Sequence, residues 1–175
     1  MSITIYDDFL HEVEFKKIEN LFLSTKYPWF WCRVLDYDGV DDAECEEKYN
    51  WQCSSAIFVH MRPVCDSFDS LTQIIGDPRL KIASVCRIKA NLNPLTDKPI
   101  KHGMHIDTPF DCTTAIFYVN SNNGYTLFED GTKVDCVKNR IVTFPSSLYH
   151  SGVSTTDTGM KVVINFNYFT YGNSN

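Results

Sequence analysis

The chain has 175 residues, of which 43% are hydrophobic and 22% charged, and these are ordinary proportions for one globular domain. Its formal net charge of -6 and its pI near 5.3 argue against a general phosphate-binding surface, because such a surface needs clustered Lys and Arg. Nucleic acid is therefore not an expected partner.

The N-terminal part predicts one short strand and two helices. The strand covers residues 2–6, and the helix after it has four apolar side chains on one face: Phe15, Ile18, Leu21 and Phe22. A second helix is predicted from about Val64, with Gly76 as its C-terminal stop and Pro78 beyond. Both helices are expected to pack against a sheet.

Residues 28–53, between these helices, combine three tryptophans with a run of Asp and Glu and predict irregular structure. The run from Asp36 lacks the Gly and Glu positions of a calcium loop, so a solvated loop is favoured over an ion site. A lid over a substrate is the third interpretation, because long loops in compact domains are often functional.

From residue 80 onward, short runs of Val, Ile, Thr, Phe and Tyr predict strands. Turn residues separate these runs, which cover residues 81–92, 113–120, 124–136, 139–144 and 160–169. The pair Asp130-Gly131 predicts a tight hairpin. Several short strands after two helices predict a mainly β (α+β) sandwich or jelly roll with helices on one sheet, in a single domain over residues 1–175.

The seven cysteines form an odd set without Cys-x-x-Cys spacing, so reduced thiols are expected rather than disulfides or a zinc site. The N-terminus has no basic start followed by a long apolar run, and no other run reaches membrane-spanning length. These features predict a cytoplasmic protein without a membrane partner.

The most informative motif is His-x-Asp at His105 and Asp107. Alternate residues of a strand point to the same side, so a strand through this segment would let the imidazole and the carboxylate converge. Such a pair suits Fe(II) and needs one more histidine to complete a facial triad. His150 is the only histidine downstream, and in a jelly roll its strand is expected beside the one carrying His105. The sequence thus predicts a metal site of His105, Asp107 and His150.

A facial triad leaves positions for a bidentate cosubstrate and O2, and the far carboxylate of that cosubstrate needs a cation. Lys161 opens the last predicted strand, eleven positions after His150, and is the predicted anchor. Asn165 lies on the same face of that strand, and its amide is predicted to hydrogen-bond the cosubstrate or another ligand.

Each of these residues has a plainer interpretation when taken alone. His-x-Asp is a common pattern, His150 fits an exposed loop, and Lys161 fits an ordinary surface charge. Their order, spacing and strand context together favour the metal site.

Other polar residues carry weaker predictions. His102 is expected to be a solvated loop residue. Arg87 and Lys89 share a strand face with Asn91 and either bind an anionic substrate or line the rim of the barrel. Tyr149 either covers the site or packs in the core.

The pattern His105-x-Asp107, then His150, then Lys161, set in these strands, resembles the 2-oxoglutarate/Fe(II)-dependent oxygenase superfamily, and most of all its prolyl 4-hydroxylase-like branch with small viral and bacterial members. The resemblance implies a double-stranded β-helix over residues 80–169, supported by helices and a variable loop within 1–79. It also implies Fe(II), 2-oxoglutarate and O2, release of succinate and CO2, and the ascorbate dependence of the family. For a viral protein, the cytoplasm would be that of the host.

The resemblance also implies roles for individual residues. His105, Asp107 and His150 match the iron ligands, and Lys161 matches the basic residue that pairs with the C5 carboxylate of 2-oxoglutarate. Tyr118 matches a tyrosine that hydrogen-bonds the same carboxylate. The polar positions near the cosubstrate are matched by Asn91 and Asn165.

The resemblance alone indicates the substrate, for which prolyl hydroxylation of a protein or peptide is the first prediction and a small molecule the second. Two alternatives stay open. A cupin-like metalloenzyme that does not use 2-oxoglutarate is one, and Lys161 argues against it. A non-catalytic β-sandwich binding module is the other, and the three intact ligands argue against it.

Overall fold

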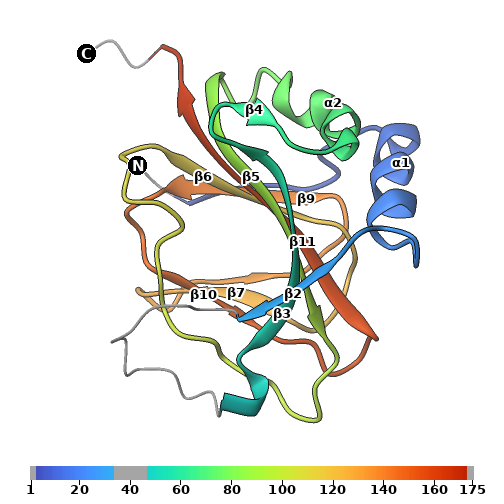
Figure 1. Ribbon diagram of the computed structural model, residues 1–175. Coiled ribbons are helices and arrows are strands. Elements are labelled where there is room, and N and C mark those ends of the chain that lie inside the picture. Colours follow the sequence, from blue (N-terminus) through green and yellow to red (C-terminus); the bar gives the residue numbers. More distant parts are fainter. Residues whose placement is uncertain (1–2, 34–46, 173–175) are drawn as a thin grey trace.

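The structure is a computed structural model, and it describes residues 3–33 and 47–172 (Figure 1). Within these residues no helix is long and apolar enough to cross a membrane. The six cysteines in this part of the chain are all free thiols. The acidic run that starts at Asp36, together with Cys45, lies outside the described residues, so its interpretation as a loop, ion site or lid stays a prediction.

The helical elements are short and lie before residue 80. They are α1 (Glu12–Phe22), η1 (Glu47–Tyr49), η2 (Asp66–Leu71) and α2 (Thr72–Ile75). The strands, in chain order, are β1 (Thr4–Tyr6), β2 (Phe30–Arg33), β3 (Trp51–Val59), β4 (Arg62–Pro63), β5 (Ile82–Pro94), β6 (Thr113–Tyr118), β7 (Tyr125–Phe128), β8 (Lys133–Asp135), β9 (Arg140–Pro145), β10 (His150–Val153) and β11 (Met160–Thr170).

The strands form two antiparallel sheets. The main sheet has the order β1-β9-β6-β11-β5-β3-β2, with β4 paired to β3, and the small sheet has the order β10-β7-β8. Isolated bridges join Lys101 to Val153 and His105 to His150, so the segment 101–105 runs along β10 as an irregular fourth member of the small sheet. Figure 1 shows α1 and α2 on one side of the main sheet and β7 and β10 on the other. The predicted mainly β fold with helices on one sheet is confirmed.

Strand β11 shows how one sequence serves both faces of the main sheet. Val162, Ile164 and Phe166 are fully buried in the core that also takes the apolar face of α1. Each such side chain stabilises the fold by roughly 1.5–3 kcal/mol. The alternate residues Lys161 and Asn165 face the small sheet and line a cavity between the two sheets. The period of two in this strand therefore separates core from site.

The prediction of irregular structure for residues 28–53 is wrong at both ends of that range. Strands β2 and β3 occupy these ends, pair with each other and extend the main sheet beyond β5. The inner face of β3 carries Gln52 and Ser54, which line the cavity. Because these polar side chains sit where an ordinary core strand has apolar ones, the usual alternation signal is absent. The N-terminal part thus supplies strands as well as supporting helices.

The helix predicted from Val64 is also different in the structure. A 3-10 helix, η2, leads into a single turn of α-helix, α2. The hydroxyl of Ser70 donates to the carbonyl of Ser67, and that of Thr72 donates to the carbonyl of Asp69. Such local side-chain bonds compete with the regular helical pattern, and the apolar spacing does not reveal them.

Asn139 generates a prediction about stability, because it ties the N-terminal segment to the turn before β9. It has φ +61, its side-chain oxygen accepts from Leu10 N at 2.9 Å, and its amide donates to Leu10 O at 2.8 Å. Asn139→Ala removes both buried bonds and leaves a less tolerant residue at positive φ, so we expect the free energy of unfolding to fall by about 3 kcal/mol. Urea denaturation measures this change.

Asn139→Gly separates the two causes, because glycine tolerates positive φ but also lacks the amide. We expect it to recover about 1 kcal/mol of the loss. An alanine variant as stable as the wild type would contradict this role of the side chain.

Candidate metal centre

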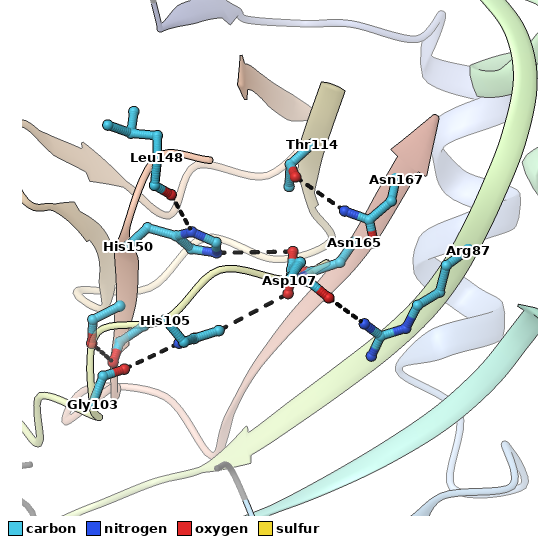
Figure 2. A network of polar contacts seen from close by, with 11 residues as sticks. Arg87, Gly103, His105, Asp107, Thr114, Leu148, His150, Asn165 and Asn167 are labelled. Atoms are coloured by element: carbon cyan, nitrogen blue, oxygen red, sulfur yellow. Dashed lines mark hydrogen bonds and ion pairs between the residues drawn. The ribbon is translucent and has the colours of Figure 1, made fainter. Parts of the chain in front are cut away.

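The three predicted ligands meet between the two sheets. The Nε2 atoms of His105 and His150 each lie 3.9 Å from a carboxylate oxygen of Asp107, and one ligand atom from each of the three residues lies within 4.8 Å of the others (Figure 2). His150 is buried, whereas His105 and Asp107 are half-buried. Two imidazoles and one carboxylate that converge in this way fit the donor set of a facial Fe(II) site.

Backbone pairing, rather than one shared strand, brings these ligands together. His105 N donates to His150 O at 2.9 Å, and His150 N donates to His105 O at 3.0 Å. The predicted strand through His105 and Asp107 does not form, because only His105 makes a bridge and Asp107 lies in a bend. The bend, not strand alternation, turns the carboxylate back toward the imidazoles.

Both imidazoles are oriented by carbonyl groups two residues earlier in the chain. Nδ1 of His105 lies 3.0 Å from Gly103 O, and Nδ1 of His150 lies 3.3 Å from Leu148 O. Donation from Nδ1 assigns the proton to that nitrogen and leaves the lone pair on Nε2. The lone pairs therefore face the position that a metal would occupy, and burial lowers the pKa of His150, which favours the neutral ligand form.

Two side chains hold Asp107 in place. The amide of Asn165 donates to Asp107 Oδ2 at 3.2 Å, and Arg87 Nη1 donates to the backbone carbonyl of Asp107 at 3.0 Å (Figure 2). The structure thus gives Asn165 a contact with a candidate metal ligand, which the sequence did not predict. Its oxygen Oδ1 is buried and has no hydrogen-bond partner among the described residues. The same holds for Oδ1 of Asn91, so both oxygens are available to a ligand.

The ligands open into a cavity of about 450 Å³ between the sheets, large enough for a small molecule. Its wall includes Lys161 and Asn91, as the sequence predicts, and also Arg87 and Lys89. Strand β5 contributes three of these residues, Arg87, Lys89 and Asn91, at alternate positions, so they share one face of the strand.

Lys161 is a buried cation with no carboxylate partner in the described part of the chain. It is 3% exposed, and its ammonium group donates to the carbonyls of Tyr125 at 3.0 Å and Val153 at 2.9 Å. No carboxylate forms an ion pair with it among residues 3–33 and 47–172. Burial lowers the pKa of Lys161. Because an uncompensated buried charge is costly, a ligand carboxylate at this position would be strongly favoured.

Tyr118 lies behind the cavity wall instead of in it. It is completely buried in the apolar cluster between the sheets, and its hydroxyl lies 2.8 Å from Thr126 Oγ1. Thr126 itself lines the cavity near Lys161. The structure therefore has Thr126, which the sequence did not single out, in the cavity wall, and Tyr118 behind it. Thr126 stands in a short run of mixed residues and carries no local signal of this role.

His102 is not the solvated loop residue that its position predicts. It is 4% exposed and lines the cavity, and Ser151 Oγ donates to its backbone carbonyl at 2.5 Å. Burial, together with Lys161 and His105 nearby, lowers its pKa to about 4. Tyr149, by contrast, is exposed and does not line the cavity.

Comparison with known proteins supports the fold. The structure resembles a 2OG-Fe(II) oxygenase family oxidoreductase from Burkholderia pseudomallei, with a TM-score of 0.69, 13% identity, and coverage of 95% of this chain and 84% of that one. It also resembles a prolyl hydroxylase from Trichoplax adhaerens in complex with a hypoxia inducible factor peptide fragment, with a TM-score of 0.64, 17% identity, and coverage of 95% and 83%.

A third similar structure is SnoN, a non-heme alpha ketoglutarate dependent epimerase from nogalamycin biosynthesis, with a TM-score of 0.65, 10% identity, and coverage of 96% of this chain and 78% of that one. No protein-family model and no curated protein sequence matches the chain. The fold is thus that of the 2-oxoglutarate/Fe(II) oxygenases, as predicted, and it is shared by proteins that catalyse different reactions.

Asn165 generates a prediction about metal affinity. Asn165→Ala removes the amide that holds the Asp107 carboxylate, and groups that orient metal ligands usually contribute at least tenfold in affinity. We expect Mn(II), used as an air-stable probe, to bind about tenfold more weakly. Calorimetric titration measures this, and unchanged affinity in a correctly folded variant would contradict a positioning role.

His102 generates a prediction about pH. Since its folded pKa of about 4 lies below the ordinary value of 6.5, its contribution to stability is complete above pH 6.5 and is lost as the pH falls toward 4. The loss amounts to about 3 kcal/mol in the metal-free protein. We expect His102→Asn to lack this part of the pH dependence.

The matched control for this experiment is His60→Asn, because His60 is exposed and lies outside the cavity. Urea denaturation at pH 7 and pH 4 should show the same pH dependence in this control as in the wild type. Equal pH dependence of the wild type and His102→Asn would show that His102 is not buried in neutral form.

Proposed function

We propose that the protein is an Fe(II)- and 2-oxoglutarate-dependent oxygenase that hydroxylates its substrate and releases succinate and CO2. The observation that carries this proposal is the location of a buried Lys161, which has no carboxylate partner among the described residues, in the same cavity as the converging triad of His105, Asp107 and His150. A metal site alone is compatible with many activities, whereas a metal site with a buried cation suits a chelating dicarboxylate.

Each residue of the site has a separate role in the proposed function. His105, Asp107 and His150 would hold the iron, which when bound supplies the redox chemistry with O2. Lys161 would pair with the C5 carboxylate of 2-oxoglutarate, and Thr126, which lines the same cavity, would donate to the same group. Tyr118 would then act through the Thr126 hydroxyl. Asn91 lines the same wall with an unpartnered oxygen and would contact the cosubstrate or the substrate.

The substrate that we propose first is a prolyl residue of a protein or peptide, which the enzyme would hydroxylate. Its support is the likeness to the Trichoplax prolyl hydroxylase, whose structure contains a bound peptide. We also place the protein in the cytoplasm, as one domain over residues 1–175, and ascorbate would maintain its activity as in similar enzymes.

A cupin-like metalloenzyme without 2-oxoglutarate is the second candidate. It would share the three ligands, but it would leave Lys161 without an anionic partner. A non-catalytic binding module is less favoured, because the imidazole lone pairs are already oriented toward a common point.

Anaerobic titration with Fe(II) and 2-oxoglutarate tests the proposal. The wild type should develop the weak visible charge-transfer band of the chelate, and His105→Ala should not. Lys161→Met should bind Fe(II) normally but 2-oxoglutarate about 100-fold more weakly, because a buried charge pair is lost.

Lys138→Met is the matched control, because Lys138 is exposed and does not line the cavity. It should behave as the wild type. No band in the wild type would overturn the oxygenase proposal, whereas full affinity for 2-oxoglutarate in Lys161→Met would overturn only the anchor.

A further inference from the structure

A second group of basic side chains lines the cavity besides Lys161. It consists of Arg33, Arg87 and Lys89, and the only carboxylate among the described lining residues is that of Asp107. The whole chain, in contrast, is acidic, with a formal net charge of -6. Positive charge gathered in a cleft focuses the electrostatic field and raises the local concentration of anions.

The two basic positions are separate. In the register of β5 and β11, Lys89 is the partner of Asn165, which holds the metal ligand Asp107. Lys161 stands four residues earlier in β11, about 13 Å along the strand. Arg87 is the next inward-facing residue beyond Lys89, and it contacts the backbone of Asp107. Lys89 and Arg87 therefore flank the Asp107 side of the metal centre, away from Lys161.

Both side chains have unused capacity to bind an anion. Lys89 is half-buried, and its ammonium group has no hydrogen-bond or ion-pair partner in the described part of the chain. Burial and the neighbouring Arg87 lower the pKa of Lys89. Arg87 donates through Nη1 to one backbone carbonyl, and the rest of its guanidinium group faces the cavity without a further described partner. An anion between the two would relieve their repulsion and satisfy their donors.

We propose that Lys89 and Arg87 form a second anion site, which recognises a carboxylate or phosphate group of the substrate beside the iron. The substrate class is then an organic acid, a phosphorylated compound, or a peptide with an acidic group close to the carbon that reacts. Arg33, whose Cζ lies 5.8 Å from the centre of the Trp51 ring, extends this basic wall toward the rim. The statement that this anion belongs to a substrate rests on the proposed function. The binding of an anion by Lys89 and Arg87 does not.

Acetate and inorganic sulfate, as probes of the carboxylate and the phosphate, test the second anion site. With Mn(II) and 2-oxoglutarate bound, acetate held beside the metal should show strong paramagnetic relaxation of its methyl protons. Lys89→Met and Arg87→Met should weaken acetate or sulfate binding at least tenfold, and the probe that binds more tightly identifies the preferred group. Lys138→Met, which changes an exposed lysine outside the cavity, should have no effect.

Two results would overturn the second anion site. One is equal binding of both probes by the wild type and Lys89→Met. The other is a loss of 2-oxoglutarate affinity in Lys89→Met as large as that in Lys161→Met, which would assign Lys89 to the cosubstrate. Sulfate titration of the metal-free protein tests the second anion site separately from the proposed function. Sulfate binding that depends on Lys89 in this form of the protein requires neither iron nor 2-oxoglutarate.

Discussion

The reciprocal backbone hydrogen bonds between His105 and His150 are the constraint on which the rest of the site depends. They join an irregular loop to the first residue of β10 and set the distance between two imidazoles that are far apart in the sequence. The bend that follows His105 returns the Asp107 carboxylate to the same point. Because main-chain atoms make both hydrogen bonds, they hold His105 and His150 together without using any side chain that the chemistry needs.

The main sheet supplies the second requirement, which is a polar cavity inside a stable fold. Strands β5 and β11 pair along almost their whole lengths, and most of the side chains that they present to the cavity at alternate positions are polar or charged. Their other faces pack under the helices in a continuous apolar core. The cost of burying Lys161 and the polar wall is thus offset within the same strands.

Electrostatics narrows what the cavity can accept. A cation at Lys161 and a separate pair at Lys89 and Arg87 lie on different sides of the candidate metal ligands, inside a protein whose overall charge is negative. Similar folds serve both a prolyl hydroxylase and an epimerase, so the fold itself does not select the substrate. The cations along β5, in contrast, belong to this chain in particular. We expect them to determine its selectivity for the substrate.

The sequence by itself determined the fold class, because strand alternation is a local property. It also predicted the candidate ligands His105, Asp107 and His150 and the candidate anchor Lys161, because ligand chemistry depends on the type and order of residues. Only the tertiary structure decided that Asp107 lies in a bend, that Tyr118 stands behind Thr126, and that His102 is buried. These features depend on which distant segment covers a residue. The covering segment sets how deeply a side chain is buried and which way it points. No sequence pattern within a single strand or loop contains this information.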